Sequence, residues 1–487
     1  MPLTDALPLL MFAALATLLF SGYPVAFVLG GIGLAFGFLG MAFDQFAFVQ
    51  FRAMPSRVFG IEENLILTAI PMFIFMGTML ERSGIARDLL NCLQVLLRRV
   101  PGGLALAVTI MGTILAATTG IIGASVVMMS LLALPIMIER KYSHQLATGT
   151  IAASGTLGIL IPPSIMLVIM ADLLERSVGN LFVAAIFPGF LLSGLYVVYI
   201  VVLCSLKPRL APPLPAHIGP GSGAELFLMI LRSFVPPVIL IVLVLGSILG
   251  GFATPTEAAG VGAAGALLLG FVNLVVLPVL GVPEMHFSGE AHAELDDHSV
   301  GGGAFSEVRH FGHVLADVVL RTGLTNAMLF GIFVGATLFS YVFRALGGDG
   351  VVVDLVNASG LGSWGLLILI LGIVFFLGFF FDWIEITLIV LPVFTPIIQL
   401  MDFGSHVERF EVVYWFAILM AVNLQTSFLT PPFGFALFYM KAVAPKEVKI
   451  EEIYLGIIPF VLLQLLGLAA VIVFPEIALW LPRVLLN

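Results

Sequence analysis

Charged residues are scarce in this chain, and their scarcity decides its class. Only 10% of the 487 residues are Asp, Glu, Lys or Arg, whereas 60% are hydrophobic. A soluble domain carries about 25% charged residues, so a soluble protein of this composition could not cover its own surface. Lipid is the solvent that tolerates such a chain. The composition therefore excludes an ordinary soluble protein and predicts a protein of the lipid bilayer.

Basic residues and cysteines are also few. The net charge of −9 is acidic, and nucleic-acid-binding proteins carry basic patches, so no nucleic-acid partner is expected. The two cysteines, Cys92 and Cys204, lie far apart, without a CxxC pattern or neighbouring His ligands. They are expected to be inert, small apolar residues.

Catalytic and nucleotide-binding motifs are missing. No HExxH, Ser–His or paired-Asp pattern occurs in the apolar segments, and His313 stands at most on the edge of one. There is no Walker A motif either. These absences argue against a membrane-embedded enzyme and against direct ATP coupling, and no cofactor is expected.

Long apolar segments follow one another along the chain, each close to the roughly 17–25 residues that cross a bilayer as a helix. The clearest are 6–21, 24–43, 64–81, 103–121, 145–171, 181–206, 225–250, 257–280, 313–343, 362–381, 412–440 and 452–478. The first has no Lys or Arg before it and no A-x-A-like site behind it, which predicts a retained membrane helix and not a cleaved signal peptide. The pattern predicts an all-α, polytopic membrane protein.

Two shorter apolar pieces, 125–138 and 383–401, stand directly behind the segments 103–121 and 362–381. Arginines precede the first of these pairs, and Arg140 follows it, so both its ends are predicted to be cytoplasmic. An apolar pair that enters and leaves on one side is a re-entrant hairpin. Counting the later segments onward predicts a second hairpin of opposite orientation.

The two hairpins also match in sequence. Ser125 stands ten residues before Pro135, and Asp382 stands ten residues before Pro392. This correspondence predicts an internal repeat with inverted topology.

A Pro-Pro pair interrupts the apolar segment behind each hairpin, at Pro162-Pro163 and at Pro431-Pro432. Consecutive prolines remove two N–H donors and clash with the preceding turn. Each segment is therefore expected to be a helix that breaks near mid-membrane, with freed carbonyls that a cation could bind. Two broken helices facing two hairpins are typical of a secondary transporter site, although single proline kinks are common in membrane helices.

Asp382 is the most informative ionisable residue, because it lies at the bend of the second hairpin. A mid-membrane carboxylate costs at least about 2.5–3.5 kcal/mol unless it is paired. Na⁺, a hard ion that prefers oxygen ligands, could offset this cost with help from the Ser125 hydroxyl. The alternative is a structural hydrogen bond from Asp382 to the hairpin backbone. Glu385, one turn further on, could be a ligand or could pair with a neighbour.

Three further polar pairs have structural alternatives. Ser154 and Asn423 each stand eight residues before a Pro-Pro pair, and either could bind a ligand or join two helices by a hydrogen bond. Asp317 and Arg321, spaced i and i+4, are expected to form an ion pair. Glu257 is expected to help cap its helix with a nearby threonine.

The residues 281–312 form the longest polar stretch and contain four histidines. They are interpreted as a flexible linker, because the histidines show no regular ligand spacing. The chain is therefore expected to divide into five regions. Residues 1–63 form scaffold helices, and 64–206 form the first repeat, with hairpin 103–138 and broken helix 145–171. Residues 207–280 form a cytoplasmic loop and further scaffold helices, 281–312 form the linker, and 313–487 form the second repeat, with hairpin 362–401 and broken helix 412–440.

Four motifs in order carry a family resemblance: 123–125 (Gly-Ala-Ser), 155–164 (Gly-Thr-Leu-Gly-Ile-Leu-Ile-Pro-Pro-Ser), 252–259 (Phe-Ala-Thr-Pro-Thr-Glu-Ala-Ala) and 429–434 (Leu-Thr-Pro-Pro-Phe-Gly). Along nearly the whole chain, this order resembles the large permease (DctM-like) subunit of tripartite ATP-independent periplasmic (TRAP) transporters.

The resemblance implies an elevator-type fold, similar to the ion transporter superfamily, in a bacterial inner membrane. It implies sodium-driven import of organic acid anions, with Na⁺ as the coupling ion. It also implies two partners: a periplasmic solute-binding protein and a separate small membrane subunit of about four helices. A carboxylate carrier of the same fold that works without a binding protein, and a channel, remain alternatives.

The family's sodium sites map onto this chain residue by residue. The matching positions are Gly123, Ser125, Thr156, Gly158, Asp382, Asn423 and Thr430. The substrate cavity is expected at Ser154, Pro162, Pro163, Ser164, Glu385, Pro431 and Pro432.

The chain departs from many relatives at two places. Ala124 replaces a serine at the first hairpin, and Trp383 follows Asp382 where small residues are common. The second variant resembles a sub-branch associated with 2-oxo acids, lactate and similar monocarboxylates, so the substrate class is expected among C4-dicarboxylates and 2-oxo acids.

Overall fold

The computed structural model describes residues 3–119, 122–213, 223–282, 304–431 and 434–485, and within these ranges every regular element is a helix. Nine of the described helices or helical runs are long and apolar enough to cross a membrane. In the first half the helices are α1 (Leu3–Leu19), α2 (Val25–Ala42), α3 (Phe48–Phe51), α4 (Ala53–Glu62), α5 (Ala69–Arg82), α6 (Ile85–Leu96), α7 (Gly103–Thr119), α8 (Ile122–Glu139), α9 (His144–Thr156), α10 (Ile165–Leu173) and α11 (Val178–Leu206).

The second half continues with helices of very different length. They are α12 (Gly223–Met229), α13 (Val235–Leu249), α14 (Pro255–Phe271), α15 (Leu277–Val279), α16 (Ala304–Ala345), α17 (Gly348–Ser359), α18 (Ser363–Leu377), α19 (Trp383–Leu400), α20 (Val412–Leu429), α21 (Phe435–Val443), α22 (Ile450–Val473) and α23 (Glu476–Leu485). Single π-helical turns join α12 to α13 and α14 to α15.

One prediction needs correction. The polar linker was expected to reach residue 312, but α16 already begins at Ala304. The residues 304–312 extend a helix that continues into the apolar segment behind them, and adding residues to an existing helix costs little. The sequence analysis assigned no element to residues 85–96, which form the amphipathic helix α6. Three of the four linker histidines lie outside the described residues, and His310 lies in α16.

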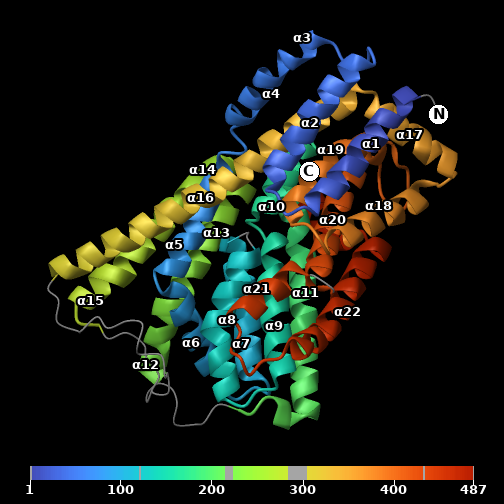
Figure 1. The fold of residues 1–487 in the computed structure, drawn as a ribbon. Coiled ribbons are helices and arrows are strands. Elements are labelled where there is room, and N and C mark those ends of the chain that lie inside the picture. The colour runs from blue at the N-terminus through green and yellow to red at the C-terminus, as the bar shows by residue number, and fades with distance from the viewer. Residues whose placement is uncertain (1–2, 120–121, 214–222, 283–303, 432–433, 486–487) are drawn as a thin grey trace.

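The helices form two groups (Figure 1). In the first, the long α16 runs diagonally beside α2, α5 and α14. Gly33 of α2 allows this approach, because a Cβ there would lie 3.2 Å from the backbone of Leu338 in α16. In the second group, α7, α8, α9, α11, α20 and α22 pack together.

Burial identifies the centre of the second group. In α20, 94% of the span is buried, against 28% for the span that begins with α14. Its Trp415 is fully enclosed and donates from its indole nitrogen to the Val471 carbonyl at 2.9 Å. The helix α20 is therefore the axis of the bundle, whereas α14 presents most of its surface outward, as a lipid-facing helix does.

The structure supports the interpretation of both cysteines and of two structural polar groups. Cys92 and Cys204 are buried, and burial raises the pKa of Cys92 to about 11. Arg321 donates from Nε to Asp317 at 2.9 Å. Thr254 caps α14, accepting from the Glu257 N–H, and Glu257 accepts from the Thr254 N–H in return. These residues stabilise helices, as predicted.

The last helix is tied to the bundle by one arginine. Arg483 of α23 donates to both carboxylate oxygens of the buried Glu411, each at 2.6 Å, and to Glu476 at 2.6 Å. The Glu411 hydrogen bonds raise the pKa of Arg483 further above its already high value, so the pair stays charged. Bidentate pairs of this kind hold a fixed geometry.

Replacing Arg483 by Met should lower the stability of the protein by about 1–3 kcal/mol, between the values for exposed and buried ion pairs, because Glu411 would remain buried without its partner. Thermal unfolding in detergent measures this as a loss of several degrees in Tm. Arg409→Met is the matched control: Arg409 and Asp402 are exposed and 3.9 Å apart. Equal Tm values for the two variants would contradict the prediction.

Candidate functional site

Both proline-interrupted segments are broken helices, as predicted. The helix α9 ends at Thr156, one 3-10 turn spans Leu157–Ile159, and α10 starts only at Ile165. Likewise α20 ends at Leu429 and α21 begins at Phe435. Each prolyl ring prevents the i to i−4 ladder from continuing.

The break in the first segment contains four of the predicted site residues: Gly158, Pro162, Pro163 and Ser164. All four are buried. The Ser164 hydroxyl donates to the Ile159 carbonyl at 2.6 Å, so a side chain satisfies one of the carbonyls that the break frees.

In the second break, Thr430 donates from its hydroxyl to the Thr426 carbonyl at 2.8 Å. Pro431 lies in the break, and Pro432 lies outside the described residues. Because the Thr430 hydroxyl only donates in this hydrogen bond, the lone pairs of its oxygen remain available to an incoming donor or cation.

Ser154 and Asn423 make equivalent contacts. The Ser154 hydroxyl donates to the Thr109 hydroxyl of α7 at 3.4 Å, and Asn423 donates from Nδ2 to the Leu371 carbonyl of α18 at 2.8 Å. Each residue thus joins its broken helix to the first helix of the preceding apolar pair. The hydrogen-bonding alternative is observed. Sodium coordination at Asn423 and a place in the substrate cavity for Ser154 stay predictions.

The two halves exchange their second half-helices. The helix α10, from the first broken segment, packs against α19 of the second apolar pair. Reciprocally, α21, from the second broken segment, packs against α8 of the first pair. The predicted inverted repeat would produce such a mutual exchange.

Thr156 and Gln425 meet where the two broken helices pack together. Each stands six residues before the first proline of its pair, and Gln425 donates from Nε2 to the Thr156 hydroxyl at 3.3 Å. Both side chains are fully buried. The ends of the two broken helices therefore lie against each other at the centre of the bundle.

Two further residues join this buried polar cluster. Gln464 of α22 donates from Nε2 to the Tyr196 hydroxyl at 2.7 Å and lies 3.5 Å from the Thr156 hydroxyl. The amide oxygens of Gln425 and Gln464 are buried and have no hydrogen-bond partner in the described part of the protein. Unpartnered buried acceptors are costly, and they leave oxygen atoms available to a cation.

Asp382 begins the second helix of its apolar pair. Its carboxylate accepts from the Trp383 N–H at 2.7 Å, and Glu385 accepts from the Asp382 N–H at 3.2 Å, which together form a capping box. Both carboxylates are half-buried. Within the described ranges neither forms an ion pair. Asp382 therefore makes the hydrogen bond to the hairpin backbone that was the structural alternative. In the described ranges, no basic side chain offsets its negative charge.

Tyr439 of α21 connects the two hairpin-like pairs. A Cβ on Gly123, at the start of α8, would lie 2.7 Å from its ring. The charges of Asp382 and Glu385 also act on its hydroxyl. Ser125, two residues after Gly123, is buried beside the same start of α8. Tyr439 thus packs against the start of α8, where the sequence predicted the first hairpin tip.

Sequence reasoning missed Tyr439, Gln425 and Gln464. Only Gln425 had a usable signal, because it occupies the position equivalent to Thr156 in the repeat. Nothing in the local sequence of Tyr439 or Gln464 indicates which distant helix each will contact.

Gly155 lets α9 approach α8 closely. A Cβ there would lie 2.6 Å from a methyl of Val126 and 3.3 Å from the Val126 Cα. Gly155→Ala should therefore destabilise the protein by about 1–3 kcal/mol through overpacking, measured as a lower Tm in detergent. Gly194→Ala in α11, where nothing lies within 4 Å, is the control and should be neutral or slightly stabilising. A Gly155→Ala variant as stable as Gly194→Ala would show that the approach is not tight.

Comparisons with known proteins agree along the whole chain. The C4-dicarboxylate TRAP transporter large permease protein DctM of Pseudomonas aeruginosa is 29% identical over 89% of this chain and 90% of its own length. The sialic acid TRAP transporter large permease protein SiaM of Vibrio cholerae is 27% identical, covering 96% and 97%. The ectoine TRAP transporter large permease protein TeaC of Halomonas elongata is 26% identical, covering 97% and 98%.

A solved structure shares the fold. The YdaH transporter of Alcanivorax borkumensis superposes with a TM-score of 0.55 at 16% identity, over 89% of this chain and 88% of that one. The protein is thus an all-helical, multi-pass membrane protein and a transporter permease, not an enzyme. Residues 12–477 match the family described as "Tripartite ATP-independent periplasmic transporter, DctM component", and the chain belongs to that family of TRAP large permeases.

Proposed function

We propose that this chain is the large permease subunit of a sodium-driven, binding-protein-dependent importer of small organic acid anions. One observation carries the coupling part of the proposal. Two half-buried carboxylates, Asp382 and Glu385, share the first turn of α19, and no basic side chain in the described ranges pairs with either. The partial positive charge of a helix N-terminus offsets about half a unit charge, so a cation from solution would stabilise the two carboxylates further.

Sodium fits the ligands that these residues offer. Na⁺ prefers oxygen, and the start of α19 supplies the two carboxylates of Asp382 and Glu385. A second oxygen-rich position lies where Thr156 meets the unpartnered amide oxygens of Gln425 and Gln464. We place the coupling ions at these two positions, one near α19 and one between the broken helices.

The substrate would enter between the two hairpins. Negative charge on an organic acid is stabilised by the N-terminal ends of half-helices and by bound sodium. Here α10 begins after Ser164 and α21 begins after Gly434, so the N-terminal end of each half-helix lies at a break. Relatives named for C4-dicarboxylates and sialic acid support an organic acid substrate. The sequence variant at Trp383 favours 2-oxo acids and similar monocarboxylates within that class.

Transport would proceed by an elevator movement. Sodium and the anion together neutralise the site, and only the loaded unit crosses the hydrophobic barrier. The two apolar pairs and the broken helices move against the group formed by α2, α5, α14 and α16. A periplasmic solute-binding protein delivers the anion, and a separate small membrane subunit of about four helices completes the transporter in a bacterial inner membrane.

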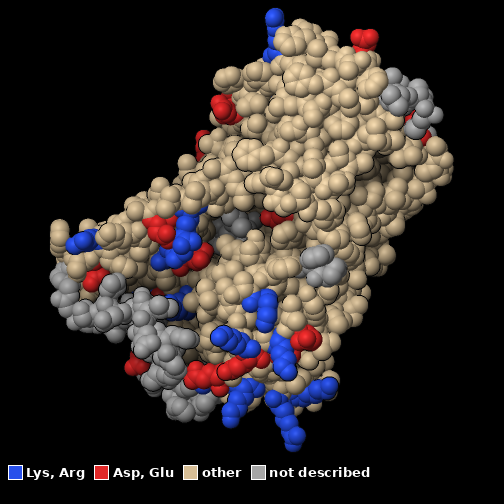
Figure 2. Space-filling view, viewed as in Figure 1, with Lys and Arg blue, Asp and Glu red and all other residues tan. Residues whose placement is uncertain are grey.

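The distribution of basic residues supports the orientation. Figure 2 shows Lys and Arg gathered at the lower end of the molecule, where α6 to α9 and α12 end. Short cytoplasmic loops accumulate Lys and Arg. The lower end is therefore assigned to the cytoplasm and the upper end to the periplasm, where the binding protein would dock.

The test is uptake into proteoliposomes that contain this chain, its small membrane partner and the cognate binding protein, with and without an inward sodium gradient. A panel of small organic acids, including 2-oxo acids and C4-dicarboxylates, identifies the substrate. Uptake that requires both sodium and the binding protein supports the proposal. Uptake that requires sodium alone would indicate a binding-protein-independent carboxylate carrier, and uptake indifferent to sodium would refute the coupling.

A further inference from the structure

Two of the helices that would move in transport pack against each other. The helix α10 comes from the first broken segment and α19 from the second apolar pair. Each carries part of the proposed site, because α10 begins at the first break and α19 begins with the capping box of Asp382 and Glu385. We call these two helices the α10–α19 unit. Contacts between this unit and the scaffold group of α2, α5, α14 and α16 therefore hold the site in place.

The first such contact joins the unit to the turn in front of α5. Asn64 donates from Nδ2 to Oδ1 of Asp172 at 2.6 Å. Asp172 is the last residue but one of α10, where a negative charge opposes the helix dipole. The carboxylate therefore does not stabilise its own helix, and it serves instead as the acceptor for a donor on the scaffold.

Asn64 is oriented by further hydrogen bonds on the scaffold side. Its Oδ1 accepts from the Ile66 N–H at 3.0 Å, as in an Asx turn. Thr256 of α14 donates from its hydroxyl to the Leu65 carbonyl at 2.7 Å, which ties this turn to the scaffold. A side chain that is already oriented loses less conformational entropy when it binds its acceptor.

The second contact joins the unit to the end of α16. Arg344 donates from Nη2 to the Pro392 carbonyl, in the middle of α19, at 2.9 Å. Within a regular helix this carbonyl would accept from the N–H of residue 396, but Pro396 has none. The sequence of α19 thus leaves an acceptor open, and the scaffold supplies the donor. Arg344 also lies 3.8 Å from Asp349, in the first turn of α17.

We propose that Asn64 and Arg344 are positioning residues that hold the α10–α19 unit against the scaffold at one end of the transport movement. Both donors belong to the scaffold and both acceptors to the unit. Because a hydrogen bond is lost beyond about 3.5 Å, sliding of the unit along the scaffold must break both bonds. They therefore favour the conformation of this structure and slow departure from it. The inference depends on the elevator movement proposed above.

The first experiment tests whether the unit moves at all. In a Cys92→Ala, Cys204→Ala background, Asn64→Cys and Asp172→Cys are joined by a short, reducible bis-methanethiosulfonate reagent. Cross-linking in proteoliposomes should lower uptake of the best-transported acid in the panel above at least about tenfold, because the movement is part of the cycle. Reductant should restore uptake. Complete cross-linking without loss of uptake would refute the elevator movement itself.

The second experiment measures the two hydrogen bonds. Spin labels on the exposed Val261 of α14 and Leu462 of α22 report the distance between the groups by pulsed electron paramagnetic resonance, since α22 packs on the broken helix α9. Asn64→Ser keeps an acceptor for the Ile66 N–H but cannot reach α10, and Arg344→Met removes the other donor. Each should lower the population at the wild-type distance, relative to a second distance, by about three- to tenfold.

Two conservative variants separate positioning from a general loss of stability. Asn64→Asp combined with Asp172→Asn exchanges the amide and the carboxylate, so a hydrogen bond can form in the reverse direction. Arg344→Lys keeps one donor for the Pro392 carbonyl. Both variants should show the wild-type distribution of distances.

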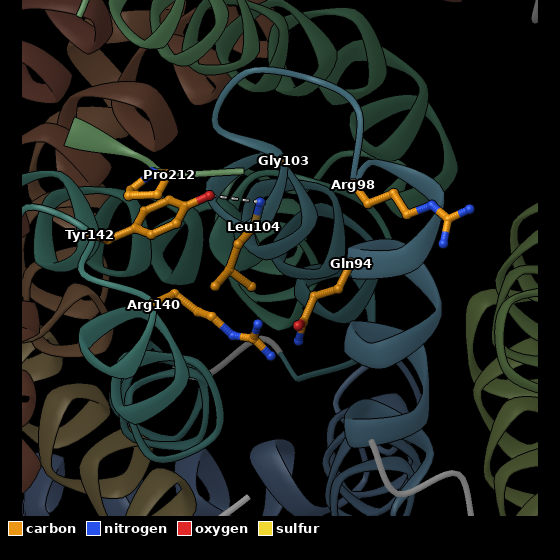
Figure 3. A pocket seen from close by; sticks show the side chains of 7 residues that line it. All are labelled: Gln94, Arg98, Gly103, Leu104, Arg140, Tyr142 and Pro212. Atoms are coloured by element: carbon orange, nitrogen blue, oxygen red, sulfur yellow. Dashed lines mark hydrogen bonds between the residues drawn. The ribbon is translucent and has the colours of Figure 1, made fainter. Parts of the chain in front are cut away.

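The controls remove hydrogen bonds that do not cross between the groups. Asn273→Ser removes a bond within the scaffold, from Nδ2 of Asn273 to the Ser83 carbonyl at 2.7 Å. Tyr142→Phe removes one within the moving group, where the Tyr142 hydroxyl accepts from the Leu104 N–H at 3.3 Å (Figure 3). The proposal is overturned if Asn64→Ser and Arg344→Met leave the distances as in the wild type, or if the controls shift them equally.

Discussion

Asp382→Asn should abolish sodium-dependent uptake while leaving the fold intact. Asparagine is as good an N-cap as aspartate, so α19 keeps the hydrogen bond from the Trp383 N–H that Asp382 now accepts. Only the negative charge is lost. A cation that offsets a mid-membrane carboxylate recovers at least about 2.5–3.5 kcal/mol, which corresponds to roughly a hundredfold in affinity. The sodium concentration for half-maximal uptake should therefore rise by about that factor, so sodium-dependent uptake is abolished at the sodium concentrations that drive the wild type.

The measurement is initial uptake in proteoliposomes as a function of sodium concentration, with Tm in detergent as the check on folding. Glu257→Gln is the matched control, since Glu257 completes a capping box of the same kind at α14, outside the proposed transport site. It should leave the sodium dependence unchanged. Wild-type sodium dependence in Asp382→Asn would refute the assignment of this carboxylate as a coupling residue.

Replacing Pro162 and Pro163 together by Ala should impair transport more than stability. The chain is non-helical between Ile159 and Ile165 because the prolines cannot continue the helix. With alanine at both positions, a continuous helix from α9 to α10 becomes possible, and each interior proline removed relieves about 3 kcal/mol. The Ile159 carbonyl would then join the helical ladder, and the break would close.

We expect uptake to fall at least about tenfold and Tm to stay level or rise, because a closed break removes the half-helix N-terminus on which anion binding depends. The control is Pro188→Ala, a buried proline inside α11, which runs unbroken through it. That variant should transport normally. Unaltered uptake in the double variant would show that the break at Pro162 and Pro163 is not needed for transport.

The two predictions differ in what they remove. Asp382→Asn deletes a charge and keeps a cap, so its effect should appear in the sodium dependence. The double proline variant keeps every charge and changes the path of the backbone, so its effect should appear in the maximal rate at saturating sodium. If both variants changed the same quantity, either the sodium dependence or the maximal rate, then the charge of Asp382 and the helix break would not have separate roles in transport.

Several structural features follow from local sequence because their causes are local. A Pro-Pro pair breaks its own helix wherever the helix is placed, and both breaks occur where they were predicted. The capping box at Thr254 and Glu257 depends on residues three apart. The Asp317–Arg321 pair lies within one turn. In each case the partner is a few residues away, so no knowledge of distant packing is required.

Other features could be predicted only as alternatives. The spacing of Ser154 and Asn423 before their prolines indicated equivalent roles, but not whether those roles were ligation or hydrogen bonding between helices. The structure shows hydrogen bonds from each to the first helix of the preceding pair. Asp382 was assigned a possible structural bond to the hairpin backbone, and that bond is present together with the unpaired charge.

The sequence by itself determined the membrane class, the main apolar helices and the two breaks. Each of these depends on composition or on residues close together in the chain. Only the tertiary structure decided that α21 covers α8, that the Tyr439 ring packs against Gly123, and that Gln464 reaches Thr156 across 308 residues of sequence. Contacts of that length depend on how whole helices pack, because a side chain's distant neighbour is set by shape complementarity between helices and not by its own local pattern.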